Sequence, residues 1–149
     1  MNKNGPIIVI EDDIDDQEVL AEIFLKLGYS NKICYFADGN IALAFINKTD
    51  VQPFLILSDI NMPKIDGFEL RNKIFTNAEL HTKCIPYLFF TTSATRKSVM
   101  DAYALSVQGF FIKPGSMQGL ENTIKKIVEY WKECIAPSEF EWVISTATE

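Results

Sequence analysis

Polar side chains stand directly after short apolar runs at several places in this 149-residue chain. Glu11 and Asp12 follow the first run, Asp59 follows a later one, and Thr91 and Lys113 end two more. Carboxylates that meet in a partly desolvated cleft repel one another, so a cation must neutralise them. Oxygen ligands without a nearby histidine or thiolate favour Mg²⁺, with Mn²⁺ as a substitute. A hydroxyl and an ammonium group would add donors for phosphoryl oxygens.

The elements that must position these residues are visible as apolar runs alternating with helical patterns. The runs are Ile7–Ile10, Ile33–Phe36, Phe54–Leu57, Tyr87–Phe90 and Phe110–Ile112. Such runs predict strands that are buried on both faces of a parallel sheet. Right-handed crossovers then give an α/β fold of the (βα)5 type, a doubly wound, five-stranded parallel sheet. The strand order 2-1-3-4-5 is one of its common solutions.

The segments between the runs carry apolar residues at helical spacing. We expect helices over residues 19–27, 41–46, 67–75, 95–103 and 116–131. Gly28 is expected to close the first helix and Asp66 to cap the third. The stretch Thr76–Cys84 fits neither period clearly.

The predicted topology brings the acidic residues to one place. Ligands of doubly wound sheets bind outside the carboxyl ends of the strands. In the order 2-1-3-4-5, strands one and three are neighbours, so Glu11, Asp12 and Asp59 are expected to converge. Asp13, Asp15 and Asp16 are expected only to form a solvated helix start, because acidic residues favour helix N-termini.

Composition narrows the functional class. The chain has 14 Lys+Arg against 20 Asp+Glu, a net charge of −6, which disfavours binding to nucleic acid or to an anionic membrane surface. No apolar run approaches the length of a membrane span. The three cysteines, Cys34, Cys84 and Cys134, are far apart and predict reduced thiols that fill the core of a cytoplasmic protein.

Four segments together resemble the receiver domains of response regulators in two-component signalling, of the chemotaxis type. They read IIVIEDD, LILSDINMPKIDGFEL, YLFFTTSA and GFFIKP. Residue types, order and separations agree across nearly the whole chain. The resemblance implies a flavodoxin-like receiver domain over residues 6–134, followed by a C-terminal extension at 135–149 and no output domain.

The resemblance also implies roles for the acidic residues. Asp59 matches the phosphoacceptor, which takes a phosphoryl group from the phosphohistidine of a kinase. Asp12 and Asp59 match direct Mg²⁺ ligands, and Glu11, the other member of the acidic pair, matches a residue that acts on the metal through water. Asn61 matches the residue whose backbone carbonyl is a further ligand.

Residues of the last two strands match the parts of the family that respond to the phosphoryl group. Thr91 resembles the hydroxyl residue that turns inward, and Lys113 the lysine that pairs with the phosphate. Pro114 falls where the family has a cis peptide bond. Phe110 falls on the aromatic switch position, although it lacks the hydroxyl that many relatives carry there.

The implied function is a single-domain response regulator. Its phosphodonor would be a sensor histidine kinase or a phosphotransfer protein, and its output would be contact with an unidentified protein target. Its own chemistry would be limited to phosphorylation and slow self-dephosphorylation, so it is not expected to be a turnover enzyme. An apolar cluster at Phe140, Trp142, Val143 and Ile144 predicts a tail that packs on its own domain or contacts a partner or a second copy.

Two alternatives remain open from the sequence. An aspartate-nucleophile phosphohydrolase uses the same residue types. Its acidic pair comes last in the chain, however, and a second Asp stands where this chain has Asn61. A degenerate receiver that serves only as an interaction module is the other alternative, and an intact set of polar residues argues against it.

Overall fold

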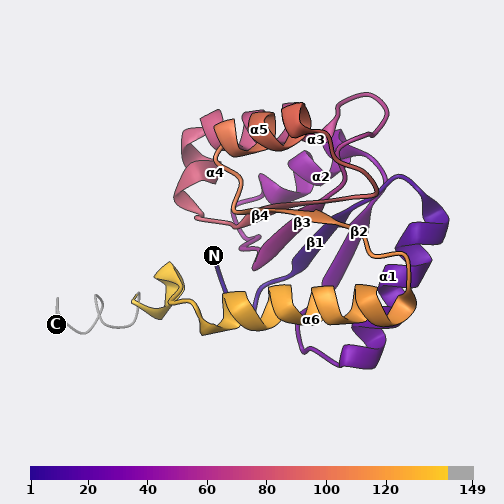
Figure 1. The fold of residues 1–149 in the computed structure, drawn as a ribbon. Helices are drawn as coiled ribbons and strands as arrows, with labels where there is room; N and C mark the ends of the chain where they lie inside the picture. The colour runs from indigo at the N-terminus through magenta and orange to yellow at the C-terminus, as the bar shows by residue number, and fades with distance from the viewer. Residues whose placement is uncertain (141–149) are drawn as a thin grey trace, which may run out of the picture.

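The computed structural model describes residues 1–140 and shows one parallel sheet with helices on both faces (Figure 1). The strands are β1 (Ile7–Ile10), β2 (Ile33–Phe36), β3 (Leu55–Ser58), β4 (Tyr87–Thr91) and β5 (Gly109–Ile112). Their order is β2-β1-β3-β4-β5, and all four neighbouring pairs are parallel. The predicted fold class and strand order are therefore confirmed.

The helices follow the predicted pattern, with two short additions. They are α1 (Ile14–Leu27), α2 (Gly39–Ile46), α3 (Gly67–Thr76), α4 (Ala78–Thr82), α5 (Arg96–Ala104), α6 (Met117–Glu133) and the 3-10 helix η1 (Pro137–Glu139). Gly28 ends α1 in the left-handed region with φ of 70°, and the Asp66 side chain accepts a hydrogen bond from Glu69 N at the start of α3. The sequence pattern did not predict α4, a helix of 5 residues whose N-terminus is capped by the Asn77 side chain.

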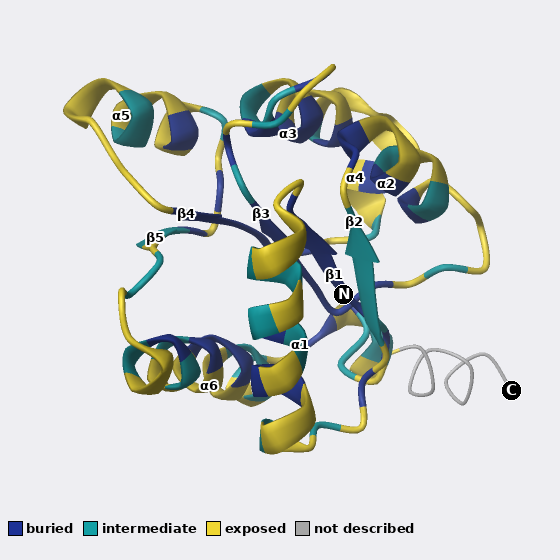
Figure 2. Cartoon of the chain, turned by 90° about the vertical axis from the view of Figure 1, so that its right-hand side faces the viewer, coloured by how far each residue is buried: buried dark blue, intermediate teal, exposed yellow. Residues whose placement is uncertain are grey.

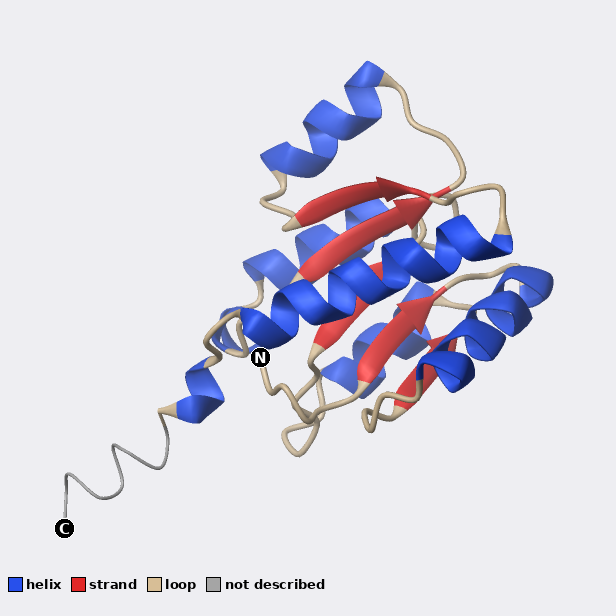
Figure 3. Ribbon diagram, turned by 60° about the horizontal axis from the view of Figure 1, so that its bottom comes forward, coloured by secondary structure: helices blue, strands red, loops and turns tan. Residues whose placement is uncertain are grey.

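Along each strand the side chains point alternately to the two faces of the sheet, which divides the core into two layers. Ile7 and Val9 face α1 and α6, whereas Ile8 and Ile10 face the layer of α2, α3, α4 and α5. Figure 3 shows α1 and α6 side by side on one face of the sheet. Because both faces are covered, the carboxyl ends of the strands are the open edge at which polar side chains can gather.

The outer strands are less buried than the sequence predicted. Every residue of β1, β3 and β4 is buried, but β2 is half-buried throughout and Ile112 of β5 is 56% exposed (Figure 2). The prediction of burial on both faces was wrong for β2 and β5. An edge strand has a neighbour on one side only, and an apolar run alone does not show which strand will be at the edge.

Two further predictions concern the cysteines and the C-terminal tail. All three thiols are free, and Cys34 and Cys134 are half-buried, but Cys84 is exposed and so is not a core residue. Phe140 is 51% exposed, and the other predicted members of the tail cluster, at positions 142–144, lie outside the described residues. Within residues 1–140, no helix is both long and apolar enough to cross a membrane.

Candidate functional site

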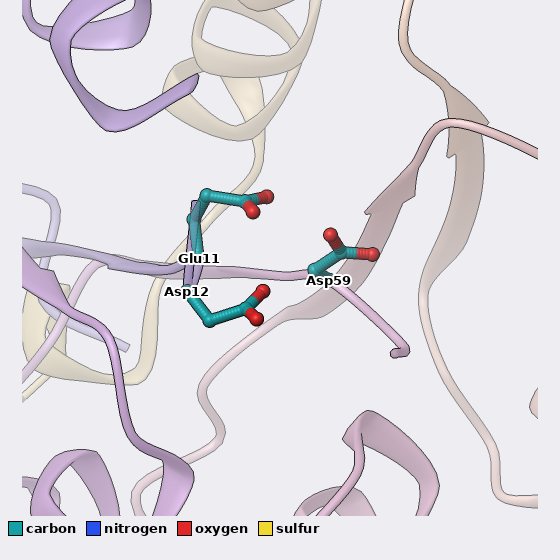
Figure 4. A group of neighbouring side chains, drawn as sticks. All are labelled: Glu11, Asp12 and Asp59. Atoms are coloured by element: carbon teal, nitrogen blue, oxygen red, sulfur yellow. The ribbon is translucent and has the colours of Figure 1, made fainter. Parts of the chain in front are cut away.

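Three carboxylates meet where β1 and β3 end. Ile10 pairs with Ser58 in the parallel register, and Asp59 N donates to the Ile10 carbonyl at 2.9 Å, so the residues after both strands lie side by side. One oxygen from each of Glu11, Asp12 and Asp59 lies within 4.8 Å of the other two (Figure 4). The predicted convergence of these side chains is present in the structure.

Lys113, which follows β5, reaches into the same cluster. Its Nζ donates a hydrogen bond to Glu11 Oε2 and lies 3.5 Å from Asp59 Oδ2. It also lies 3.3 Å from Asp16 Oδ2. The prediction that Asp16 is only a helix-start residue was therefore wrong, because the first turn of α1 places this carboxylate beside the lysine. Asp13 is the N-cap of α1, as expected.

The backbone holds Lys113 in place without the cis peptide bond that the resemblance implied. Residues 1–140 contain no cis peptide bond, so the bond before Pro114 is trans. Lys113 N donates to the Thr91 carbonyl at 2.7 Å, which continues the pairing of β4 with β5. With this peptide bond trans, the ammonium group of Lys113 still lies among the carboxylates of the cluster.

Burial and charge shift the proton affinities of the cluster. The pKa of Glu11 is raised to about 7, because burial penalises its charged form and Asp59 repels it, although the hydrogen bond from Lys113 opposes the change. The pKa of Lys113 is raised, because the nearby carboxylates, Glu11 first among them, outweigh the effect of burial. One lysine thus faces several carboxylates, and the cluster is short of positive charge.

The loop after β3 is fixed closely around Asp59. Ile60 N donates to Asp59 Oδ1 at 2.7 Å, and Gly67 N donates to the Ile60 carbonyl at 2.7 Å. A Cβ atom at Gly67 would lie only 2.4 Å from the Asp59 carbonyl oxygen, so this position requires glycine. Asn61 is exposed in the same loop, and the role of its carbonyl stays a prediction.

Thr91 and Phe110 lie on the neighbouring strands. Thr91 ends β4 and is 1% exposed, and its hydroxyl makes no hydrogen bond to any group in residues 1–140. Phe110 is half-buried, and its ring packs on that of Phe89 with centroids 6.0 Å apart. The structure brings both residues to the carboxyl half of the sheet, and their switching roles stay predictions.

The donor set of the cluster fits a hard divalent cation. Glu11 is 2% exposed and Asp12 is exposed, so the group opens to solvent on one side only. Among residues 1–140, the group contains carboxylates alone, without histidine or cysteine. Carboxylate oxygens that converge with too little positive charge are the ligands preferred by Mg²⁺ and Mn²⁺.

The sequence matches the response regulator receiver domain over residues 7–125. The chain belongs to this family. Chemotaxis protein CheY-3 of Vibrio cholerae is 30% identical over 129 residues, which cover 87% of this chain and 95% of that protein. Response regulator Rcp1 of Synechocystis is 29% identical over 134 residues, covering 87% of this chain and 90% of Rcp1.

Solved receiver structures are also similar to this one. The phosphorylated cyanobacterial phytochrome response regulator RcpA superposes with a TM-score of 0.81 at 26% identity, covering 90% of this chain and 99% of RcpA. The Mn²⁺-bound form of Rcp1 superposes with a TM-score of 0.77 at 28% identity, covering 89% of this chain and 97% of Rcp1. The chain is a receiver-type response regulator of two-component signalling, a family that binds divalent metal and contacts histidine kinases or phosphotransfer proteins.

Proposed function

We propose that Asp59 is the phosphoacceptor of this receiver, and that the phosphodonor is a histidine kinase or a phosphotransfer protein. The observation that carries the proposal is the convergence of Asp59 with Glu11 and Asp12, whose carboxylate oxygens lie within 4.8 Å of one another, beside Lys113. A nucleophilic carboxylate, a cation site and a positive side chain are the parts that phosphoryl transfer to aspartate needs.

In the proposed reaction, an Asp59 oxygen attacks the phosphorus of a phosphohistidine. The new P–O bond forms as the P–N bond breaks, and the leaving imidazole nitrogen keeps the bonding electron pair. Lys113 lies where its ammonium group can pair with a phosphoryl oxygen, and Thr91 offers a hydroxyl donor beside it. Asp59 ends as an acyl phosphate.

Glu11, Asp12, Asp59 and the Asn61 carbonyl are the groups that would hold Mg²⁺, or Mn²⁺ in its place. A cation bound there spreads negative charge from the oxygens of the transferring group. Asp12 and Asp59 would be direct ligands and Glu11 would act through a bound water, while Asp59 would also be the nucleophile.

The phosphoryl group would then act as a signal. It adds nearly two negative charges and three acceptors beside Thr91, so the hydroxyl gains a hydrogen bond by turning toward Asp59. The Phe110 ring is the neighbouring group that would repack, and the face around α5 would present the change to a protein target. The chemistry of the protein would be limited to its own phosphorylation and to hydrolysis of the resulting aspartyl phosphate. Residues 6–134 would form the receiver and residues 135–149 an extension, and the protein would act in the cytoplasm.

Intact-mass measurement after incubation with acetyl phosphate and Mg²⁺ tests this proposal. The wild-type protein is expected to gain one phosphoryl group, and chelation of Mg²⁺ with EDTA is expected to prevent the gain. Asp59→Asn should gain none, whereas Asp15→Asn, which changes an exposed carboxylate of α1, should behave as wild type. An equal gain in Asp59→Asn would overturn the proposal, and multiple turnover of a phosphate monoester would favour the phosphohydrolase.

A further inference from the structure

A second site lies at the opposite end of the sheet from Asp59. A cavity of about 310 Å³ opens beside the residues that precede β4 and β5, among them Pro86 and Gln108. Because the strands are parallel, these residues mark the amino end of the sheet, and α4 lies there as well (Figure 1). The proposed phosphorylation chemistry makes no use of this cavity.

A buried arginine forms part of the cavity wall. Arg71 of α3 is 5% exposed. Its Nε donates to the Leu105 carbonyl at 3.0 Å, and its Nη2 donates to the Ser106 carbonyl at 2.8 Å. Across residues 1–140, no carboxylate lies within ion-pair distance of this guanidinium and no third acceptor bonds to it. The buried positive charge is therefore held by two carbonyl dipoles and by the rings of Phe75 and Tyr87, whose centroids lie 5.1 and 5.4 Å from it, and not by a negatively charged group.

The two hydrogen bonds have a structural use, which is to cap the carboxyl end of α5. That use occupies two of the five N–H donors of a guanidinium and leaves the others for a further acceptor. A buried charge without a counter-charge is costly, and burial lowers the pKa of the Arg71 guanidinium. An anion in the adjoining cavity would offset that cost.

The remaining walls of the cavity are suited to a flat apolar group. Phe75 and Trp131 line it, together with aliphatic side chains such as Ile74. The Arg71 guanidinium lies over the Phe75 ring at 5.1 Å, and His81 packs its edge on the same ring with centroids 5.3 Å apart. Ligand sites of this type combine apolar and aromatic walls with a few polar groups that fix orientation.

We propose that this cavity binds a small aromatic carboxylate, with the carboxylate on Arg71 and the ring against Phe75 and Trp131. A planar guanidinium matches a planar carboxylate through two parallel hydrogen bonds, which a neutral group cannot reproduce. The size of the cavity, about 310 Å³, suits a small molecule and not a folded partner. The site does not depend on Asp59 or on its phosphorylation.

Fluorescence of Trp131 provides the first test. The chain contains two tryptophans, so Trp142→Phe leaves Trp131 as the only reporter. Benzoate is the probe and benzamide its neutral control. Benzoate is expected to change the Trp131 emission saturably and to bind at least about tenfold more tightly than benzamide, because a hydrogen bond between charged groups is stronger than one between neutral groups. Equal binding of the two compounds, or no saturable response at millimolar concentrations, would overturn the proposal.

The exposed thiol of Cys84, which also lines the cavity, provides a test of location. Bound benzoate is expected to slow the alkylation of Cys84 by iodoacetamide, while Cys34 and Cys134, measured in the same digests, react at unchanged rates. Fluorescence changes without protection of Cys84 would place benzoate elsewhere and contradict the proposal.

Arg71→Lys tests the role of the guanidinium itself. An ammonium group keeps the charge but cannot form the paired hydrogen bonds, so benzoate affinity is expected to fall toward that of benzamide. A thermal melt shows whether this variant folds. If it does not, the comparison of benzoate with benzamide on the Trp142→Phe protein still decides. A folded Arg71→Lys variant that binds benzoate as tightly as the parent would contradict the proposal.

Discussion

The two ends of the sheet differ in the sign of the charge that the chain leaves unbalanced. At the carboxyl end, Glu11, Asp12 and Asp59 gather around the single ammonium group of Lys113. At the amino end, the Arg71 guanidinium is buried against carbonyl groups, and no carboxylate in residues 1–140 pairs with it. One end therefore suits a cation and a phosphoryl group, and the other suits an anion. Within one fold, the sign of the unbalanced buried charge indicates what each end can bind.

The largest effect is expected at the carboxyl end, from removal of its positive charge. Lys113→Met should slow phosphorylation by acetyl phosphate about 10²–10³-fold, the usual cost of losing one positioned donor to a developing charge. The rate is measured by intact mass against time at saturating Mg²⁺. Lys97→Met, which removes an exposed lysine of α5, is the control and should leave the rate unchanged. A Lys113→Met rate within twofold of wild type would show that the lysine does not serve the reaction.

The next effect concerns the backbone that carries Asp59. Gly67→Ala should reduce the free energy of unfolding by roughly 3 kcal/mol, because its Cβ would press against the Asp59 carbonyl and neither backbone can move freely. Gly115→Ala is the matched control, since a Cβ there meets nothing within 4 Å. Urea denaturation compares the two variants. Similar stabilities would mean that the loop after β3 adapts easily.

At the amino end, loss of the arginine should weaken the fold less. Arg71→Met removes the donor to the Leu105 carbonyl and leaves the Ser106 carbonyl with Gln108 Nε2 alone, which should cost about 2 kcal/mol of unfolding free energy. Arg96→Met, at an exposed position of α5, should change stability by less than about 0.5 kcal/mol. If the two variants unfold at the same urea concentration, Arg71 contributes nothing to the end of α5.

The smallest expected effect is the stabilisation of the fold by Mg²⁺, which should depend on the carboxyl end of the sheet and not on the amino end. At ten times its dissociation constant, Mg²⁺ should stabilise the wild-type protein by about 1.4 kcal/mol. Arg71→Met should show the same gain, whereas Asp12→Asn should show much less, because it lacks one carboxylate ligand. Thermal melts with Mg²⁺ and with EDTA provide the comparison. A gain in Asp12→Asn equal to that of wild type would place the cation elsewhere.

The sequence predicted those parts of the structure that depend on local patterns. The run Ile7–Ile10 is β1 as predicted, and Gly28 and Asp66 cap their helices as their residue types indicated. The acidic cluster was predicted as well, because strand order and the rule for parallel sheets together determine which strand ends are neighbours.

What the sequence did not predict depends on contacts between distant segments. The link from Arg71 to the end of α5 joins residues 34 and 35 positions apart, and in the sequence Arg71 is an ordinary member of a helical pattern. The contact of Asp16 with Lys113 spans 97 positions. The half-burial of β2 was missed because an apolar run is the same at the centre and at the edge of a sheet.

The most direct measurement of the central claim is the chemical location of the phosphoryl group. The protein is treated with acetyl phosphate and Mg²⁺, reduced with borohydride, which converts an aspartyl phosphate to homoserine, and then mapped by peptide mass spectrometry. The account predicts homoserine at position 59 and at no other aspartate. Homoserine at another position with Asp59 intact would contradict it.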